Sequence, residues 1–367
     1  MTRLTPRAHF VGYVRDPKGT PPVVSPFLPH PDVVAATLRL LGLPVADDPV
    51  ANEIMLSDRL GYEPMFMTEF DSLLFPWKVD EQRSDDATIV SVIETQRGTW
   101  EKKVSRRLGV WGDEEGFPVK TEADHAKLVS ACDGIGDRER ELREYFSRWR
   151  ARVGENGVIV LGHPHVSCLS YQIGLAGMIL HWNDFPHTYR VSMEAVCRAS
   201  LFVMEIAMTE GVDFMSDSTF GLEINSPALI EEMDIPYLRR FAAWTHERGG
   251  LFWYHNCGHT RPLIRDGTFN RMGADVIETI APLPCGDNDL AESRRWLDSS
   301  ICSKGNLNLG ILHDGTPDEV TAATRDLVAA VRGYAHIYST ADAVLEGTPP
   351  ENFIAFLDGI KRFSIHP

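Results

Sequence analysis

The stretch Leu251–Arg271, LFWYHNCGHTRPLIRDGTFNR, decides both the fold and the candidate site. It opens with four apolar residues, which is typical of a strand buried on both faces. His255 and Cys257 follow, and alternate residues of an extended chain point to the same side. Imidazole and thiolate ligands together favour zinc. The sequence therefore predicts a buried strand that ends in a zinc-binding pair, and the alternative is a hydrogen-bonded histidine beside a small buried cysteine.

Apolar strands and helices alternate on both sides of this stretch. The predicted strands are 22–27, 62–70, 157–162, 212–217, 251–255, 275–279, 303–307 and 334–338. Repeated strand–helix units indicate a parallel sheet, and seven or eight of them favour an α/β fold closed as a (β/α)8 TIM barrel. A Gly-x-Gly-x-x-Gly motif after an early strand is missing from the sequence, which argues against a dinucleotide-binding fold.

The domain organisation that we predict is a single TIM-barrel domain over residues 1–367. Residues 1–20 are polar and rich in Pro and Gly, and we interpret them as an N-terminal extension that leads into the barrel. Residues 71–125 contain β-branched, alternating segments, which predict a small inserted β hairpin or sheet.

The composition narrows the classes of function. A formal net charge of -16 argues against a nucleic-acid partner or an anionic membrane surface. The six cysteines are scattered, the N-terminus lacks the apolar run of a signal peptide, and no window approaches the roughly 20 apolar residues of a membrane span. We expect a soluble, cytoplasmic protein that acts on a small molecule, with a homodimer as one option for its assembly.

Functional side chains of such a barrel lie at the carboxyl ends of its strands. Glu278 ends the strand after the His-Cys pair, so we predict that it is a third metal ligand and a catalytic residue. The alternative is a carboxylate that meets a helix N-terminus or an arginine. Asp217 ends an earlier strand, and we predict a catalytic acid or base, a substrate contact or an orienting partner for the metal histidine. An Asx-turn or helix-capping role is the alternative for Asp217.

Other polar residues near strand ends complete the predicted site. His163 and His165 follow a strand, and substrate binding and plain loop structure both remain open for them. Asn306 and Tyr338 are predicted to contact substrate. Cys285 lies in the loop after Glu278, where it is either a fourth metal ligand or an inert thiol.

Six ordered motifs in the second half of the chain resemble the uroporphyrinogen decarboxylase superfamily. They are His255-Asn256-Cys257-Gly258, Ala274-Asp275-Val276-Ile277-Glu278, Pro284-Cys285-Gly286-Asp287, Lys304-Gly305-Asn306-Leu307, Gly315-Thr316-Pro317-Asp318-Glu319-Val320 and Gly347-Thr348-Pro349-Pro350-Glu351-Asn352. Within the superfamily the chain looks more like the corrinoid-linked methyltransferases, because residues 20–60 lack the arginine-rich segment of the haem-pathway decarboxylase.

The resemblance implies a (β/α)8 barrel that binds Zn²⁺ and transfers a methyl group from a small, methoxy-aromatic type of substrate. The acceptor would be a corrinoid (cobalamin) on a partner protein, as in O-demethylase systems. Those families place a last cysteine before the Thr-Pro-Pro-Glu-Asn motif, and this chain has none there. Either Cys285, His336 or Asp342 replaces it, or three protein ligands leave one position open. The alternatives are a metal-independent decarboxylase of a carboxylated ring compound and a non-catalytic barrel that binds a small molecule.

Overall fold

The structure is a computed structural model that describes residues 4–85, 87–105, 116–162, 169–219 and 221–364. The chain divides into two compact units, and each is described by itself. Unit 1 comprises Met1–Thr68, Arg148–Val160 and Val212–Pro367, and unit 2 comprises Glu69–Ser147 and Leu161–Gly211.

Seven parallel strands form the centre of unit 1, in the order β1-β5-β6-β7-β8-β9-β10. Their bounds are Met65–Met67 (β1), Val158–Val160 (β5), Phe214–Thr219 (β6), Leu251–Asn256 (β7), Val276–Glu278 (β8), Cys302–Leu307 (β9) and His336–Thr340 (β10). Each neighbouring pair is also consecutive along the chain in this sheet, as in a TIM barrel. The predicted α/β barrel is confirmed.

The short segment around Val24 joins the two edges of this sheet. Val24 forms a parallel bridge with Tyr338 of β10, and its carbonyl oxygen accepts a hydrogen bond of 2.8 Å from the Glu63 amide, two residues before β1. The strand predicted over 22–27 is therefore reduced to a single bridge, which nevertheless links β10 to the chain that enters β1.

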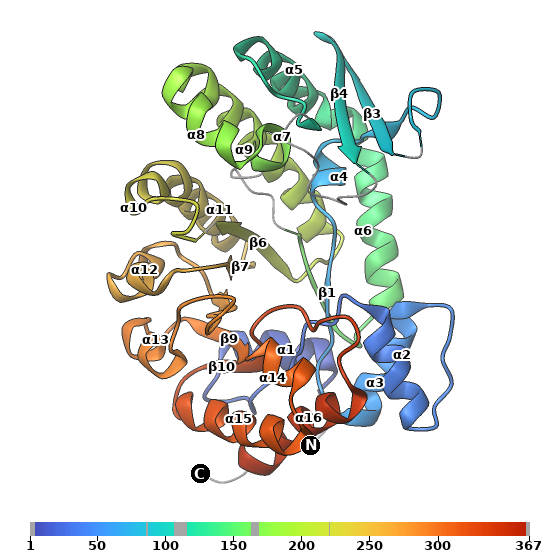
Figure 1. Cartoon of the computed structure of the whole chain (residues 1–367), viewed down its shortest axis with the longest axis vertical. Helices are drawn as coiled ribbons and strands as arrows, with labels where there is room; N and C mark the ends of the chain where they lie inside the picture. The colour runs from blue at the N-terminus through green and yellow to red at the C-terminus, as the bar shows by residue number, and fades with distance from the viewer. Residues whose placement is uncertain (1–3, 86, 106–115, 163–168, 220, 365–367) are drawn as a thin grey trace. The chain divides into compact units, whose positions relative to one another are not determined.

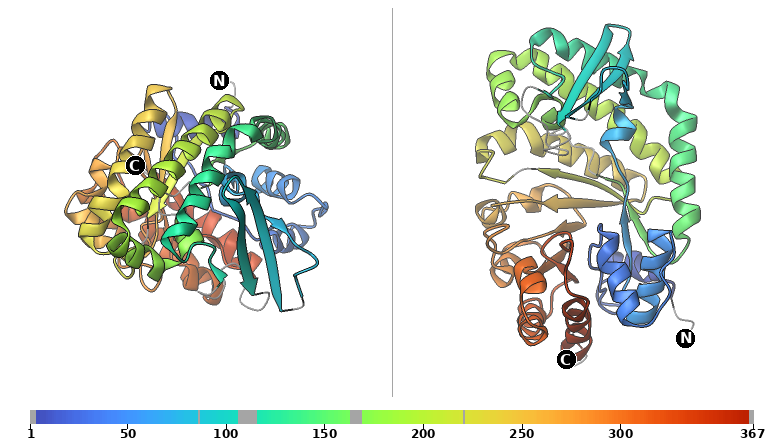
Figure 2. Two further views of the ribbon diagram at one scale, coloured as in Figure 1. Left: turned by 90° about the horizontal axis from the view of Figure 1, so that it is seen from above. Right: turned by 45° about the vertical axis from the view of Figure 1, so that its right-hand side comes forward.

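Helices cover the outside of the barrel strands. Those of unit 1 are α1 (Pro6–Arg15), α2 (Pro31–Leu40), α3 (Pro49–Leu60), α10 (Pro227–Leu229), α11 (Ile235–Glu247), α12 (Arg261–Arg265), α13 (Leu290–Trp296), α14 (Leu309–Asp314), α15 (Pro317–Ala330) and α16 (Pro350–Ser364). In Figure 1, α11, α12, α13 and α15 follow one another along the outer side of the strands. Figures 1 and 2 both show α2 and α3 side by side.

The predicted N-terminal extension contains a helix that the sequence analysis did not assign. Thr5 caps α1 by accepting a hydrogen bond from the Ala8 amide, and Pro6 stands at the first helical position. Phe10, Tyr13 and Val14 share one face of α1 and are buried in the barrel core. The sequence did not predict this helix because the first 20 residues are rich in Pro and Gly.

Alternation along the strands decides which side chains face the barrel interior. Trp253 of β7, Val276 of β8 and Cys302 of β9 are register neighbours and belong to one buried hydrophobic cluster. Two residues further along, the same face carries the polar side chains His255, Glu278 and Lys304, which are again register neighbours. The core cluster therefore ends in a polar layer toward the carboxyl ends of the strands.

Unit 2 contains the predicted insertion. Its antiparallel sheet has the order β2-β3-β4, with bounds Lys78–Val79, Thr88–Thr95 and Gly98–Ser105. Its helices are α4 (Asp71–Leu74), α5 (Glu122–Asp133), α7 (Leu169–Ile173), α8 (Leu175–Asp184) and α9 (Pro186–Thr209), and a 3-10 helix spans Gly134–Arg138. Helix α6 (Glu139–Val153) begins in unit 2 and ends in unit 1. The small inserted sheet is confirmed.

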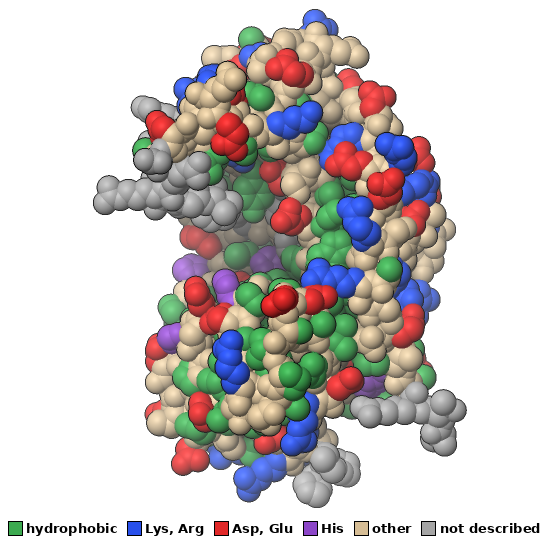
Figure 3. All heavy atoms as spheres, turned by 90° about the vertical axis from the view of Figure 1, so that its right-hand side faces the viewer, with side chains coloured by type: hydrophobic (Ala, Val, Ile, Leu, Met, Phe, Trp, Pro, Cys, Tyr) green, Lys and Arg blue, Asp and Glu red, His purple; other side chains and the backbone are tan. Residues whose placement is uncertain are grey.

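The surface carries charges of both signs. On the face that Figure 3 shows, acidic and basic side chains are interspersed. None of the helices in the described ranges has the length and apolar character needed to cross a membrane.

Candidate metal centre

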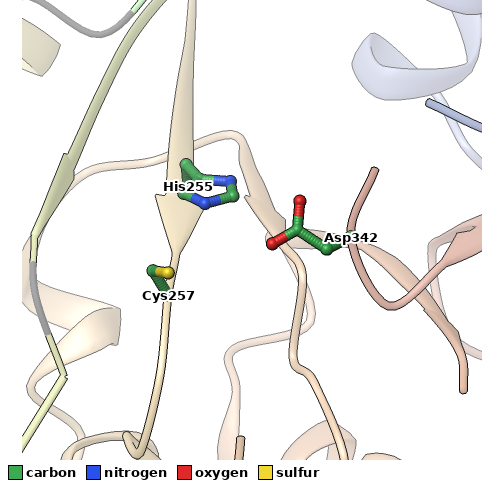
Figure 4. Close-up of side chains that lie close together, drawn as sticks. All are labelled: His255, Cys257 and Asp342. Carbon is green, nitrogen blue, oxygen red and sulfur yellow. The ribbon is translucent and has the colours of Figure 1, made fainter. Parts of the chain in front are cut away.

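Three potential metal ligands converge at the end of β7. His255 is the fifth residue of β7, Cys257 follows the strand, and Asp342 lies just after β10. One ligand atom from each lies within 4.8 Å of the others. Figure 4 shows the Asp342 carboxylate directed toward the other two side chains from the opposite side. The two residues predicted first from the sequence thus acquire a carboxylate partner, which was one of the three candidates for the last ligand.

Glu278 lies next to this group but holds other partners. Its Oε1 is 3.3 Å from Nδ1 of His255, and its Oε2 is 3.1 Å from Nζ of Lys304. Lys304 is buried, and its ammonium lies 5.7 Å from the centre of the Trp253 ring. Glu278 was predicted as a third ligand, and the geometry places it between Lys304 and His255, where it can orient the imidazole.

The electrostatics of this layer follow from its burial and its charges. Burial acts to raise the pKa of Glu278, but the Lys304 charge and the His255 hydrogen bond outweigh it and lower the pKa to about 2. Burial acts to lower the pKa of His255, yet hydrogen bonds to Cys257 and Glu278 and the charge of Asp342 raise it well above its ordinary value. Without a metal ion, these contacts favour the protonated form of the His255 imidazole.

Two acidic side chains hold the loop that carries Cys257. Glu223 accepts a hydrogen bond of 2.8 Å from the His259 amide, and Asp287 accepts one of 2.8 Å from the Thr260 amide. Gly258, which directly precedes His259 in this loop, has φ of +78°. A Cβ at this position would lie 1.8 Å from Oε1 of Glu223. Only glycine fits this turn without displacing Glu223.

Cys285 lies beside the site. Gly258 and Gly286 form a parallel bridge, so the residues before them, Cys257 and Cys285, are neighbours across it. Partial burial and the charges of Asp342 and Cys257 raise the pKa of the Cys285 thiol. Both cysteines are exposed, and Cys285 does not belong to the converging group found among the described residues.

The other strand-end candidates have different surroundings. Both ring nitrogens of His336 have partners, the Ser303 hydroxyl at 2.7 Å and the Gly305 carbonyl at 2.8 Å. Asn306 donates a hydrogen bond of 2.8 Å to the Ile280 carbonyl. Tyr338 contacts the ring of His336 and, by alternation, faces away from the core residue Ile337.

Asp217 also lies away from the converging side chains. It is the register neighbour of Tyr254, whereas Ser218 is the neighbour of His255. Asp217 and Tyr254 therefore share the outer face of the sheet, and Asp217 accepts a hydrogen bond of 2.8 Å from the Ser218 amide. His163 and His165 lie outside the described residues.

Lys304 lies in the candidate site but was not predicted from the sequence. The motif Lys304-Gly305-Asn306-Leu307 was used only for its resemblance to a family. Cys302 faces the barrel core, and Lys304, two residues further along the same strand, faces the same side. A lysine at such a position indicates a buried charge, and a buried lysine requires a partner. Pairing it with Glu278 requires the β8–β9 register, which the sequence does not contain.

The donor set fits a zinc ion. One imidazole, one thiolate and one carboxylate are the ligand types that zinc takes in proteins, and three protein ligands with an open position are typical of catalytic zinc. A carboxylate hydrogen-bonded to the second nitrogen of a metal-binding histidine is the usual supporting contact, and Glu278 supplies it.

The sequence family agrees with this fold. The model of the uroporphyrinogen decarboxylase (URO-D) family matches residues 149–363, so the chain belongs to that family. The expected family resemblance is thereby confirmed.

Known relatives match part of the chain. The uroporphyrinogen decarboxylase of Coxiella burnetii (strain RSA 493 / Nine Mile phase I) is 24% identical over 187 residues, which are 49% of this chain and 49% of the relative. That of Synechococcus sp. (strain CC9902) is 41% identical over 86 residues, 23% of each chain. The match to the Coxiella burnetii protein thus spans about half the length of that relative. The match to the Synechococcus sp. protein spans 23% of that relative.

A solved structure has the same fold over the full length. A methyltransferase from Methanosarcina mazei superposes with a TM-score of 0.69, covering 99% of this chain and 100% of its own, at 15% sequence identity. The family is thus one of enzymes, its curated relatives are decarboxylases, and the fold is shared with a methyltransferase.

Proposed function

We propose that the protein is a zinc-dependent methyltransferase that moves a methyl group from a small substrate, of the methoxy-aromatic type, to a corrinoid on a partner protein. The observation that carries the proposal is the convergence of His255, Cys257 and Asp342 within 4.8 Å at the carboxyl end of barrel strands. A decarboxylation that needs no metal gives no reason for a thiol, an imidazole and a carboxylate to meet at this point.

The ligand residues that we propose are His255, Cys257 and Asp342. The chemistry that zinc supplies when bound is Lewis acidity toward the oxygen atom that carries the methyl group. Cys257 is exposed and His255 partly so, which leaves the site open to a substrate. The open position that three protein ligands leave is where the substrate oxygen would bind.

Glu278 and Lys304 act through His255 in this proposal. Nδ1–H of His255 donates to Glu278, which directs Nε2 toward the site as the nitrogen that binds the metal. The Lys304 charge keeps Glu278 ionised, so that it remains a hydrogen-bond acceptor. Zinc takes neutral imidazole as a ligand, so His255 would hold the metal through Nε2 without a proton on that nitrogen. The proposal has no role for Asp217, which lies on the outer face of the sheet.

Metal content tests the ligand assignment. Purified wild-type protein, loaded with zinc and dialysed, is expected to retain one zinc by plasma mass spectrometry. Cys257→Ser and Asp342→Asn are expected to lose most of it, whereas the matched control Cys285→Ser retains it. Full retention by both Cys257→Ser and Asp342→Asn would remove the proposed site.

Turnover separates the methyltransferase from the second candidate, a decarboxylase. The observation that favours a decarboxylase is the name shared by the family and its relatives. Zinc-loaded protein is expected to transfer a methyl group from a methoxybenzoate to cob(I)alamin and to lose this activity with a chelator. Release of carbon dioxide from a carboxylated ring compound by chelated, metal-free protein would favour the decarboxylase instead. Saturable binding of a methoxybenzoate with neither reaction would favour the non-catalytic barrel.

A further inference from the structure

Glu53 of α3 is a buried acidic side chain that lacks a partner. Only 6% of the residue is exposed. Among the described residues, no group hydrogen-bonds to its Oε1 and no cation pairs with it. A buried carboxyl group without a partner is costly, because burial removes its hydration and nothing replaces it. Burial raises the pKa of Glu53 well above its ordinary value for this reason.

A cavity of about 230 Å³ lies against this residue, within unit 1. Glu53 and Val50, one turn apart on α3, line one side of it. Phe66 of β1 and Trp149 at the end of α6 line another side, with their ring centres 6.4 Å apart. Glu53 is the one ionisable residue among the described residues that line the cavity. The cavity is thus apolar with a single acidic group.

We propose that this cavity is a binding site for a small apolar molecule that carries one primary amine. Its ammonium group pairs with the Glu53 carboxylate, and its body lies against Phe66 and Trp149. The protein itself provides no cation for Glu53 in the described residues, whereas an ammonium ligand provides both the charge and the hydrogen-bond donors. The aromatic rings add favourable contacts to a cation next to them.

The size and charge of the cavity narrow the class of ligand. An engineered apolar cavity of about 150 Å³ holds one benzene molecule, so 230 Å³ accommodates an aromatic ring with a short amine chain. A ligand with a carboxylate would add a second buried acidic group beside Glu53, where the described lining residues provide no cation for either. This site is separate from the metal centre, and the inference does not depend on the proposed function.

Binding is coupled to proton release. Burial raises the pKa of the Glu53 carboxyl group, which favours its protonated form before binding. An ammonium ion next to it favours the ionised form, so amine binding shifts the carboxyl group toward release of its proton to solvent, while the ligand keeps all three of its own. A neutral ligand of the same size, such as an alcohol, hydrogen-bonds to the protonated carboxyl group and releases none.

Isothermal titration calorimetry with the whole purified chain tests this proposal. The probes are phenethylamine, 2-phenylethanol and 3-phenylpropanoate, each titrated in two buffers of different ionisation enthalpy. We expect the amine to bind most tightly, with a buffer-dependent heat that reports proton release. Glu53→Gln, which keeps the side-chain size, is expected to weaken amine binding by about tenfold or more. The alcohol should be affected much less.

A second buried acid provides the matched control. Asp234 is buried, and its Oδ2 has no hydrogen-bond partner among the described residues, but it does not line this cavity. Asp234→Asn should leave amine binding unchanged. The proposal is overturned if wild-type protein binds none of the amine at millimolar concentration, or if Glu53→Gln and wild type bind it equally. Preference of wild type for the carboxylate probe would overturn it as well.

Discussion

Nζ of Lys304 lies 3.1 Å from Oε2 of Glu278, and both side chains are almost completely buried. This ion pair connects β9 to β8, and the second oxygen of Glu278 continues the connection to His255 on β7. The ion pair and the hydrogen bond thereby connect three neighbouring strands, in the polar layer that follows the hydrophobic core. The link explains how a lysine outside the proposed ligand set can determine the orientation of His255, the histidine of the proposed metal site.

Lys304→Met should destabilise the protein by about 3 kcal/mol, because it leaves the Glu278 carboxylate buried without its cation. Urea unfolding at pH 7 measures the change in the free energy of unfolding. The same variant should also bind zinc more weakly in a chelator competition, since Glu278 then no longer holds the imidazole of His255 in one orientation.

The double variant Lys304→Met/Glu278→Gln is the control for that experiment. If the two residues act as a pair, its destabilisation is smaller than the sum of the two single variants by about 1 kcal/mol or more. Strict additivity would show that the contact contributes nothing to stability.

Gly258→Ala should destabilise the protein by about 2 kcal/mol. About half of this comes from placing alanine at φ +78°, and the rest from displacing Glu223 from the His259 amide. Gly249→Ala is the matched control, because Gly249 has φ of +72° and no atom lies within 4 Å of the position that a Cβ would take there. It should cost about 1 kcal/mol and leave zinc binding unchanged, whereas Gly258→Ala should reduce zinc binding. Equal effects of the two variants on stability and metal content would contradict the role of Glu223.

Most of the fold was predictable because parallel strands in a barrel are short apolar runs separated by helices. The strands β6 to β10 stand close to their predicted positions for this reason. Helix α1 was missed because Pro and Gly in the first 20 residues favour an irregular segment, and few of its residues are buried. The two units were not predicted either, because their separation depends on contacts between segments far apart in the sequence.

Asp234→Asn is expected to stabilise the protein at neutral pH and above. Burial raises the pKa of Asp234 to about 7, whereas the unfolded chain loses this proton near 3.8. The folded state therefore binds more protons between these values, and stability falls as pH rises through that window. The gain in the variant should reach up to about 4 kcal/mol at pH 8 and vanish below pH 4. Melting temperatures across this range measure it, and a gain that is the same at every pH would contradict the assignment.

His125 should make unit 2 sensitive to acid. Its Nδ1 lies 2.8 Å from the Ser192 hydroxyl and its Nε2 lies 3.0 Å from Nδ1 of His181. Burial, and then the charge of His181, lower the pKa of His125 to about 4, so the folded state keeps this ring neutral. Its contribution to stability is complete above pH 6.5 and is lost as pH falls toward 4, because the unfolded chain takes up the proton first.

Urea unfolding between pH 7 and pH 4 measures this effect. The free energy of unfolding should fall by up to about 1.4 kcal/mol per pH unit from this one residue, and His125→Gln should reduce that slope. The exposed His187 provides the control, since His187→Gln should leave the slope unchanged. An unchanged slope in His125→Gln would contradict the prediction.

The candidate site was predictable only in part. His255 lies in β7 and Cys257 follows directly after its last residue, so local sequence was sufficient to bring the two together. Asp342 could be named only as one of three options, because its position depends on the path of the chain after β10. The contact of Glu278 with Lys304 depends on the register between β8 and β9. The placement of Asp217 on the outer face depends on which residues of β6 point toward the barrel interior.

The most direct test of the central claim is X-ray absorption at the zinc edge of the zinc-loaded protein. We expect one sulfur ligand at about 2.3 Å, from Cys257, with nitrogen and oxygen ligands at about 2.0–2.2 Å from His255, Asp342 and an exchangeable position. The sulfur should disappear in Cys257→Ser and remain in Cys285→Ser. A spectrum without sulfur in the wild-type protein would contradict the account, and so would a shell of two sulfur ligands, which would put Cys285 in the site.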